Sequence, residues 1–201
     1  MGPLQADAIL REAYAMGVDR AILLTDRKFA GADTLATSFA LASALKTLDY
    51  DLIITGRQAI DGDTAQVGPE MAEHLQLPQV TYVTDLIYDT THNLFTVNKE
   101  TEEGYQILEV APPCVLTVLA SANRARYMSV SGIMTAFDKE VEVWDAARLN
   151  VDENRLGLSG SPTRVKKSFT KPQKTPGQVY GVDAEEAVGI IISKLKEKFI
   201  I

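Results

Sequence analysis

The residues whose types and spacing could bind a ligand lie in the stretch GRQAIDGDTAQVG, from Gly56 to Gly68. Its glycines and small side chains let backbone N–H groups approach a bound molecule closely. Where such a loop opens a helix, the unpaired amides and the helix dipole favour an anion such as a phosphate. The stretch therefore has the build of a nucleotide site, although it matches neither the dinucleotide fingerprint nor the Gly-Lys-Ser/Thr phosphate loop.

Two features of this loop leave its role open. Asp61 and Asp63 would repel a phosphate unless their carboxylates turn away to cap backbone or to bind hydroxyl groups. The loop could also be an ordinary connection between a strand and a helix, with Asp63 or Thr64 as the helix N-cap and the glycines in tight turns. The residues thus indicate a site but not its ligand.

The elements around the loop alternate between strand and helix. Apolar runs predict strands at 21–26 and 51–56, and helices are predicted at 5–17, 33–48 and 69–76. This alternation is typical of an α/β fold with parallel strands and helices on the faces of the sheet. In such Rossmann-like sheets the ligand crevice lies outside the carboxyl ends of the strands, where this loop would sit.

The second half of the chain predicts additions to this sheet. Strands are predicted at 79–88, 94–98 and 104–110, with turns between them that indicate an antiparallel addition. They are followed by a strand at 114–120, a helix at 129–138 and a strand at 140–144.

An arm and a terminal helix are predicted to complete the chain. The stretch 150–181 is polar and rich in proline and basic residues, including Lys171, Pro172 and Lys174, and 184–199 has the spacing of an amphipathic helix. We therefore expect an α/β domain at 1–149, and an extended C-terminal arm with its helix at 150–201.

Composition argues against several classes of function. A net charge of −7 argues against nucleic-acid binding, and the chain has no apolar run long enough to insert into a membrane. The single cysteine, Cys114, excludes an internal disulfide and a multi-cysteine metal site. His74 and His92 give little support for a metal site or for histidine-based catalysis. We expect a cytoplasmic protein without a metal.

The string GRQAIDGDTAQVGPEMAEHL closely resembles the signature of the beta subunit of electron transfer flavoproteins. Three further stretches agree with that family in order, at 1–26, 26–45 and 115–144. The resemblance is strong to about Trp144 and looser beyond it. Family members begin with a further stretch that contains the first strand of the sheet, so the chain resembles an N-terminally shortened member.

The resemblance implies a heterodimeric electron carrier whose alpha subunit holds a redox-active FAD. In one branch of the family the beta subunit holds AMP, and in another it holds a second FAD that splits the electrons of NADH between two acceptors. The segment 29–38, together with Gly62, Thr64, Ala65 and Val67, resembles the second branch. FAD is therefore the expected cofactor, with AMP as the alternative, and the flavin would carry the redox chemistry without a catalytic residue from this chain.

The family's ligand contacts carry over onto matching positions. The expected cofactor-binding residues are Gly2, Thr34, Thr37, Gly56, Asp61, Gly62, Asp63, Thr64, Ala65, Gln66, Val67 and Gly68. Replacing Gln66 by alanine or Gly68 by valine is expected to weaken nucleotide retention without unfolding the protein.

The resemblance also implies two partners. A recognition loop that docks into an acyl-CoA dehydrogenase-type partner is expected at Tyr127, Met128, Ser129, Val130 and Ile133. Taken alone, a methionine such as Met128 is more often core filler than interface. The terminal helix and its arm are implied to reach across the alpha subunit, the alternative being that they pack on the chain's own core.

Two other classes of function stay open. The chain could be a stand-alone adenine-nucleotide hydrolase or transferase in which Asp61 and Asp63 anchor magnesium beside the substrate's phosphates. It could also be a structural interaction module whose nucleotide site has lapsed. Nucleotide turnover without a partner would favour the first, and the absence of any bound nucleotide would favour the second.

Overall fold

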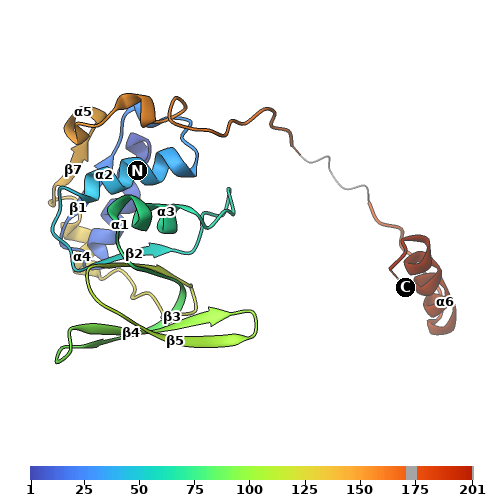
Figure 1. The fold of residues 1–201 in the computed structure, drawn as a ribbon. Coiled ribbons are helices and arrows are strands. Elements are labelled where there is room, and N and C mark those ends of the chain that lie inside the picture. Colours follow the sequence, from blue (N-terminus) through green and yellow to red (C-terminus); the bar gives the residue numbers. More distant parts are fainter. Residues whose placement is uncertain (171–175, 201) are drawn as a thin grey trace. The chain divides into compact units, whose positions relative to one another are not determined.

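The computed structural model describes residues 1–170 and 176–200, and it divides into two compact units (Figure 1). The first unit is Met1–Arg164 and the second is Val165–Ile201. Lys171, Pro172 and Lys174, which were predicted to belong to the arm, lie outside the described residues.

The first unit contains seven strands and five α-helices. In chain order they are α1 (Asp7–Ala15), β1 (Ala21–Leu24), α2 (Thr34–Leu45), β2 (Leu52–Gly56), α3 (Val67–Leu75), β3 (Gln79–Asp89), β4 (Leu94–Thr101), β5 (Gly104–Val110), β6 (Cys114–Val118), α4 (Val130–Thr135), β7 (Val141–Trp144) and α5 (Ala146–Leu149). Single 3-10 turns lie at Leu4–Ala6, Arg27–Phe29 and Glu153–Arg155. The predicted α/β class is confirmed.

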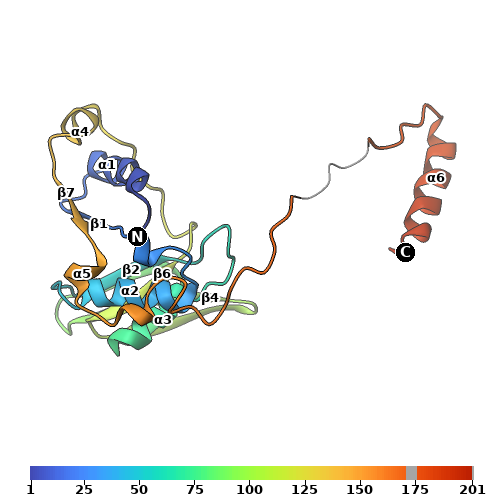
Figure 2. The ribbon, with the colours of Figure 1, turned by 90° about the horizontal axis from the view of Figure 1, so that it is seen from above.

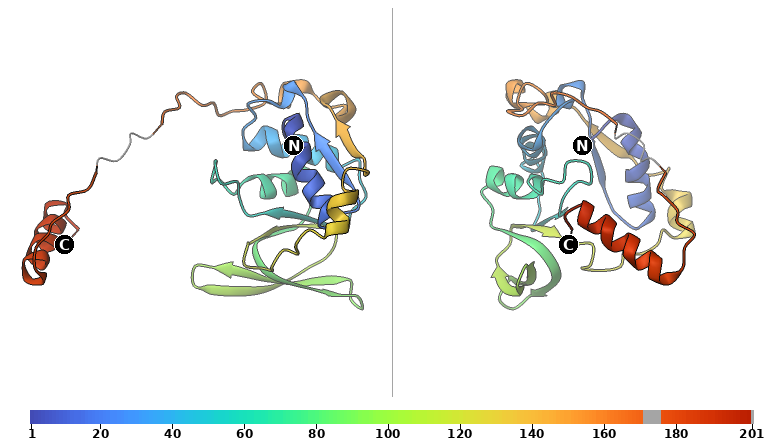
Figure 3. Two further views of the ribbon diagram at one scale, coloured as in Figure 1. Left: turned by 180° about the vertical axis from the view of Figure 1, so that it is seen from behind. Right: turned by 90° about the vertical axis from the view of Figure 1, so that its right-hand side faces the viewer.

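The strands form two sheets. β2 and β3 each run parallel to β6, and β4 runs antiparallel to both β3 and β5, so that the order is β2-β6-β3-β4-β5. β3 therefore joins the two parts of the sheet: it pairs with β6 in the parallel part and with β4 in the predicted antiparallel addition. β1 and β7 form a separate parallel pair. In Figures 1 and 3, α2 and α3 lie above β2, and β3–β5 extend below it.

The helix α3 packs on β2 and β6 because its apolar residues share one face. Met71 and Ala72 are buried with Ile53 of β2 and Val115 of β6. Pro69 lies in the first turn of α3, where its missing N–H costs no hydrogen bond. This packing places the start of α3 at the carboxyl ends of both strands.

α1 and α4 lie side by side, apart from α2 and α3 (Figure 2). Arg11 of α1 links them, since its Nη1 donates to the carbonyl oxygen of Ala136 at 2.9 Å and also to that of Lys139. The helix predicted at 129–138 is shorter in the structure, where α4 ends at Thr135. Arg11 fixes the residues that follow α4, because it binds the carbonyl oxygens of Ala136 and Lys139.

The first unit extends to Arg164, beyond the boundary predicted at 149. Leu156 is only 1% exposed and packs with Phe29 and Trp144, and the buried Ser161 also belongs to this unit. The polar composition of 150–164 hid this packing, because one leucine and a few hydrogen bonds hold the segment in place.

Asp33 makes most of these hydrogen bonds. Its Oδ1 accepts from the N–H of Ala36 at 3.1 Å and so caps α2, and its Oδ2 accepts from the backbone N–H and the hydroxyl of Thr163 at 3.0 and 2.8 Å. Its own N–H donates to Ser161 Oγ at 2.8 Å. Burial raises the pKa of Asp33, but these hydrogen bonds outweigh it and hold the pKa below its ordinary value.

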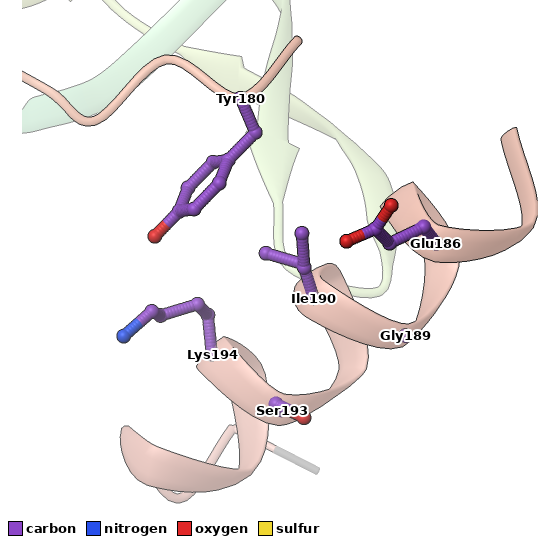
Figure 4. Close-up of a pocket in the computed structure, with 6 residues that line it drawn as sticks. All are labelled: Tyr180, Glu186, Gly189, Ile190, Ser193 and Lys194. Atoms are coloured by element: carbon purple, nitrogen blue, oxygen red, sulfur yellow. The ribbon is translucent and has the colours of Figure 1, made fainter. Parts of the chain in front are cut away.

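The second unit is described by itself and contains α6 (Ala184–Glu197), which Asp183 caps. Tyr180 lies across one side of α6 and encloses a shallow hollow of about 390 Å³ (Figure 4). The hollow is lined by Tyr180, Glu186, Gly189, Ile190, Ser193 and Lys194. Val188 and Ile191 of the predicted apolar face are more than half exposed.

We predict that Asp33→Ala lowers the free energy of unfolding of the first unit by about 1–2 kcal/mol, since a helix cap and the tie to Thr163 are both lost. Because its folded pKa is depressed, the Asp33 carboxylate stabilises the fold above its unfolded pKa of about 3.9, and this contribution is lost as pH falls through the folded pKa. Urea denaturation between pH 3 and 7 measures both effects.

The matched control is Asp183→Ala, which removes a helix cap of the same kind from the other unit. It is expected to leave the main unfolding transition unchanged. Equal stability of wild type and Asp33→Ala at neutral pH would contradict the role given to Asp33.

Candidate functional site

The predicted nucleotide loop joins the carboxyl end of β2 to the start of α3, and it projects beyond the end of that strand (Figure 1). Thr55 pairs with Thr117 of β6, and Gly56 pairs with Val118. Because β2 and β6 are parallel, both strands end at the same edge of the sheet, which is where Rossmann-like sheets bind ligands.

Gly68 lets α3 begin directly against these strand ends. A Cβ atom at this position would lie 2.7 Å from Thr55 Oγ1 and 2.7 Å from Thr117 Cγ2, closer than packed atoms approach. Gly68 is buried, so no shift toward solvent would relieve the contact. The glycine is therefore required by packing, whatever ligand the loop binds.

The start of α3 carries no side-chain cap. Its N-cap residue is Gln66, whose side chain makes no hydrogen bond to the helix amides. The alternative in which Asp63 or Thr64 caps this helix is therefore wrong. A helix start without a cap offers its first amides and its positive dipole end to an anion.

A polar network joins the first turns of α2 and α3. Thr34 Oγ1 lies 3.0 Å from Gln66 Oε1 and 3.3 Å from Glu70 Oε1. One hydroxyl proton serves a single acceptor at a time, so Thr34 donates to either Gln66 Oε1 or Glu70 Oε1. Two residues predicted from sequence, Thr34 and Gln66, are thus brought together.

The two loop carboxylates are turned to local donors. Asp61 Oδ1 accepts from the N–H of Gly62 at 2.9 Å, and Asp63 Oδ1 accepts from the side-chain amide of Gln58. Asp63 and Ala65 also adopt left-handed backbone conformations, with φ of 51° and 53°. This arrangement meets the condition under which the carboxylates do not oppose a nearby phosphate.

The structure leaves two predicted residues apart from this network. The N–H of Gly2 donates to the carbonyl oxygen of Leu24 at the end of β1, at 3.0 Å. Thr37 lies one turn after Thr34 in α2, where its N–H donates to the carbonyl oxygen of Asp33. In the described residues neither makes a hydrogen bond to the loop.

The predicted recognition loop is exposed. Tyr127 is 97% exposed and Val130 is 77% exposed, while Ser129 caps α4 through its Oγ, which accepts from the N–H of Gly132 at 2.9 Å. Met128 and Ile133 are 43% and 48% exposed, so the alternative that Met128 is core filler is wrong.

The exposed residues at 128–137 border a groove beside α1. The groove has a volume of about 540 Å³ and is lined by Leu4, Gln5, Asp7, Ala8, Arg11, Glu12, Ala15, Met128, Ile133, Ala136 and Phe137. Its lining combines apolar side chains with the charged groups of Asp7, Arg11 and Glu12.

Sequence reasoning missed several residues at the strand ends. Thr55 Oγ1 and Glu70 Oε2 are buried without a hydrogen-bond partner in the described residues. Tyr82 reaches this edge through an irregular pairing of β3, and the guanidinium of Arg57 lies over its ring. Only Arg57, a cation directly after Gly56, carried a signal that the sequence alone could have supplied.

Two further groups have shifted pKa values. Cys114 is fully buried, and burial raises the pKa of its thiol. Burial and the charge of Arg155 lower the pKa of His74, whose ring meets Phe39 edge-on. Both therefore favour the neutral form near neutral pH.

Residues 1–170 and 176–200 contain neither a group of metal-binding side chains nor a helix that could span a membrane. Within them, no three histidine, cysteine, aspartate or glutamate side chains are grouped closely enough to hold a metal ion. Within the same residues, every helix is too short or too polar to span a bilayer.

Comparison with known proteins identifies the family. Residues 1–149 match the model of the electron transfer flavoprotein domain. The chain is 54% identical over 198 residues to the electron transfer flavoprotein subunit beta of Clostridium acetobutylicum, covering 98% of this chain and 76% of that protein.

Two further relatives have names that describe larger assemblies. Subunit CarD of the caffeyl-CoA reductase-Etf complex of Acetobacterium woodii is 46% identical over 203 residues, covering 100% of this chain and 77% of the relative. The electron transfer subunit gamma of acryloyl-CoA reductase of Anaerotignum propionicum is 42% identical over 209 residues, covering 100% and 78%.

We predict that Gly68→Ala lowers the free energy of unfolding by about 1–3 kcal/mol, because its Cβ would overlap Thr55 and Thr117. The expectation that Gly68→Val leaves the fold intact therefore changes, since the larger side chain meets the same atoms. Urea denaturation measures the effect. Gly62→Ala is the matched control, because a Cβ there has open space around it, and a loss as large as that of Gly68→Ala would contradict the packing argument.

Proposed function

Because the chain belongs to the electron transfer flavoprotein family and matches its beta subunits along nearly its whole length, we propose that it binds FAD at the 56–68 loop and acts in a heterodimeric electron carrier. When bound, the flavin supplies the redox chemistry. This chain's own residues bind and orient the cofactor, and none of them acts as a covalent or acid–base catalyst.

The observation that carries this proposal is the uncapped start of α3 at the carboxyl edge of β2 and β6. Its amides suit the phosphates of FAD or AMP. Beside it, Thr55 Oγ1 and Glu70 Oε2 are buried and have no hydrogen-bond partner among the described residues. Buried polar atoms are normally hydrogen-bonded, so a ligand at this edge would supply the missing partners. The residues present therefore fit an adenine nucleotide.

The choice of FAD over AMP, and of electron bifurcation over simple transfer, rests on the segment 29–38 and on the small residues of the loop. Thr34 of this segment lies at the start of α2, with its hydroxyl within hydrogen-bond distance of Gln66 in the loop. A carrier with structural AMP is the alternative. In a magnesium-dependent hydrolase, Asp61 and Asp63 would bind the cation through the carboxylate oxygens that do not accept these local hydrogen bonds.

The proposed partners are an alpha subunit and an acyl-CoA dehydrogenase-type protein. Relatives named as parts of CoA reductase complexes support the second. The exposed tip around Val130 supplies the docking surface, and the apolar face of α6 supplies a surface for the alpha subunit. The proposed setting for this complex is the cytoplasm.

The decisive experiment is to express the protein together with its alpha subunit and to count the cofactors. Mass spectrometry of the released ligands and flavin absorbance give the cofactors per heterodimer. Two flavins support the FAD proposal, and one flavin with one AMP supports the simpler carrier. Nucleotide hydrolysis by the chain alone would overturn both.

We predict that Gln66→Ala weakens nucleotide binding by the heterodimer by roughly five- to tenfold, the value of one hydrogen-bonded bridge. Equilibrium dialysis measures the dissociation constant, and a thermal melt checks the fold. Gln106→Ala, an exposed glutamine of β5 away from the loop, is the control. Unchanged affinity in Gln66→Ala would show that the bridge to α2 does not hold the ligand.

We predict that Val130→Asp slows electron transfer to the dehydrogenase by about tenfold or more while leaving cofactor content unchanged, since a charge would enter an apolar contact. Stopped-flow reduction with the purified dehydrogenase measures the rate. Ile107→Asp, the same kind of apolar-to-charged change on β5 at a position 62% exposed, serves as the control. Equal rates for wild type and Val130→Asp would remove this tip from the docking surface.

A further inference from the structure

An arginine is held over a tyrosine ring at the edge of the sheet that carries the proposed nucleotide site. Arg57 directly follows β2, and its guanidinium carbon lies 5.6 Å from the centre of the Tyr82 ring. Its Nε donates to Gln58 Oε1 at 2.8 Å. Among the described residues no carboxylate pairs with Arg57, so its terminal NH₂ groups are available to a ligand.

Tyr82 holds its place through an unusual backbone conformation. Its φ is 57°, in the left-handed region where bulky residues are rare. The pairing of β3 with β6 shifts register between Val80 and Val83, and the N–H of Tyr82 donates to Thr117 Oγ1 at 3.2 Å. Such bulges re-aim a side chain at the cost of local strain.

Thr117 connects this pair to the start of α3. Its Oγ1 accepts from Tyr82, while its Cγ2 lies 2.7 Å from the position that a Cβ on Gly68 would take. The same threonine side chain therefore accepts from Tyr82 and fills the space beside Gly68. The cation of Arg57 thus stands at the same carboxyl edge as the uncapped helix amides.

Arg57 is linked to the charged side chains of the loop. Asp61 and Asp63 give the loop two negative charges, and each carboxylate accepts a hydrogen bond from a local donor. Gln58 connects one of them to Arg57, since its amide nitrogen donates to Asp63 and its oxygen accepts from Arg57. Arg57 is the loop's own positive charge.

We propose that Arg57, positioned by Tyr82, binds a phosphate group of the adenine nucleotide. The proposal rests on the proposed function and adds to it a side-chain phosphate contact. A guanidinium suits this role because its planar fork bonds two phosphate oxygens at once. The tyrosine ring holds the guanidinium in place through a cation–π contact and so reduces the entropy lost on binding.

The test compares AMP with adenosine, which lacks the phosphate, on the nucleotide-free heterodimer. Arg57→Gln is expected to weaken AMP binding by about tenfold or more and to leave adenosine binding unchanged. Arg57→Lys keeps the charge but loses the planar fork, so its affinity for AMP is expected to lie between those of wild type and Arg57→Gln. Arg148→Gln is the matched control, because it removes an arginine that lies 4.4 Å over Trp144, in a different part of the first unit.

Tyr82 is tested as a positioning residue. Tyr82→Leu is expected to weaken AMP binding by a smaller factor than Arg57→Gln and to spare adenosine, and Tyr82→Phe is expected to restore AMP binding because the ring is retained. Raising the salt concentration reduces the difference between wild type and Arg57→Gln, since the contact is ionic.

Different outcomes overturn different claims. Equal AMP affinity in wild type and Arg57→Gln overturns the phosphate contact, as does an equal loss for AMP and adenosine. If Arg57→Gln does not fold, Arg57→Lys and the salt dependence of wild-type AMP binding decide, and salt-independent binding overturns the inference. A wild-type heterodimer that binds neither ligand refutes the proposed function itself, whereas FAD found in place of AMP leaves the inference standing.

Discussion

The candidate site depends on the close contact between the start of α3 and the ends of β2 and β6. Gly68 lacks the Cβ atom that would collide with Thr55 and Thr117, so the first amides of the helix come as near to the strand ends as the backbone permits. The hydroxyl of Thr117 also accepts from the N–H of Tyr82 and so fixes the bulge of β3. One missing methyl group thus allows strand, helix and bulge to meet at a single edge.

Short polar side chains connect the elements around this edge. Thr34 joins the start of α2 to that of α3 through Gln66 and Glu70, and Asp33 ties the segment at 157–163 to the same end of α2. Hydrogen bonds of this kind contribute about 1 kcal/mol each, but they fix direction in a way that apolar packing does not. The position of the loop therefore depends on helix starts held by a few side chains.

The proposed carrier requires the chain to meet other molecules, and its surface is consistent with that. The apolar residues around Val130 and along α6 are exposed in their own units. A cofactor held by amides and by one arginine leaves the redox chemistry to the flavin. In this proposal the chain contributes affinity, orientation and partner choice.

Much of the fold was determined by sequence alone, because local patterns carry it. The alternation of apolar runs with helical spacing gave the α/β class, and the loop after β2 was recognisable by its glycines. The α2 contact of Gln66 and the packing of Leu156 could not be predicted, since both join residues far apart in the chain. Tyr82 is the clearest case. Its sequence reads as ordinary strand, and only the register between β3 and β6, which depends on three-dimensional packing, turns it toward Arg57.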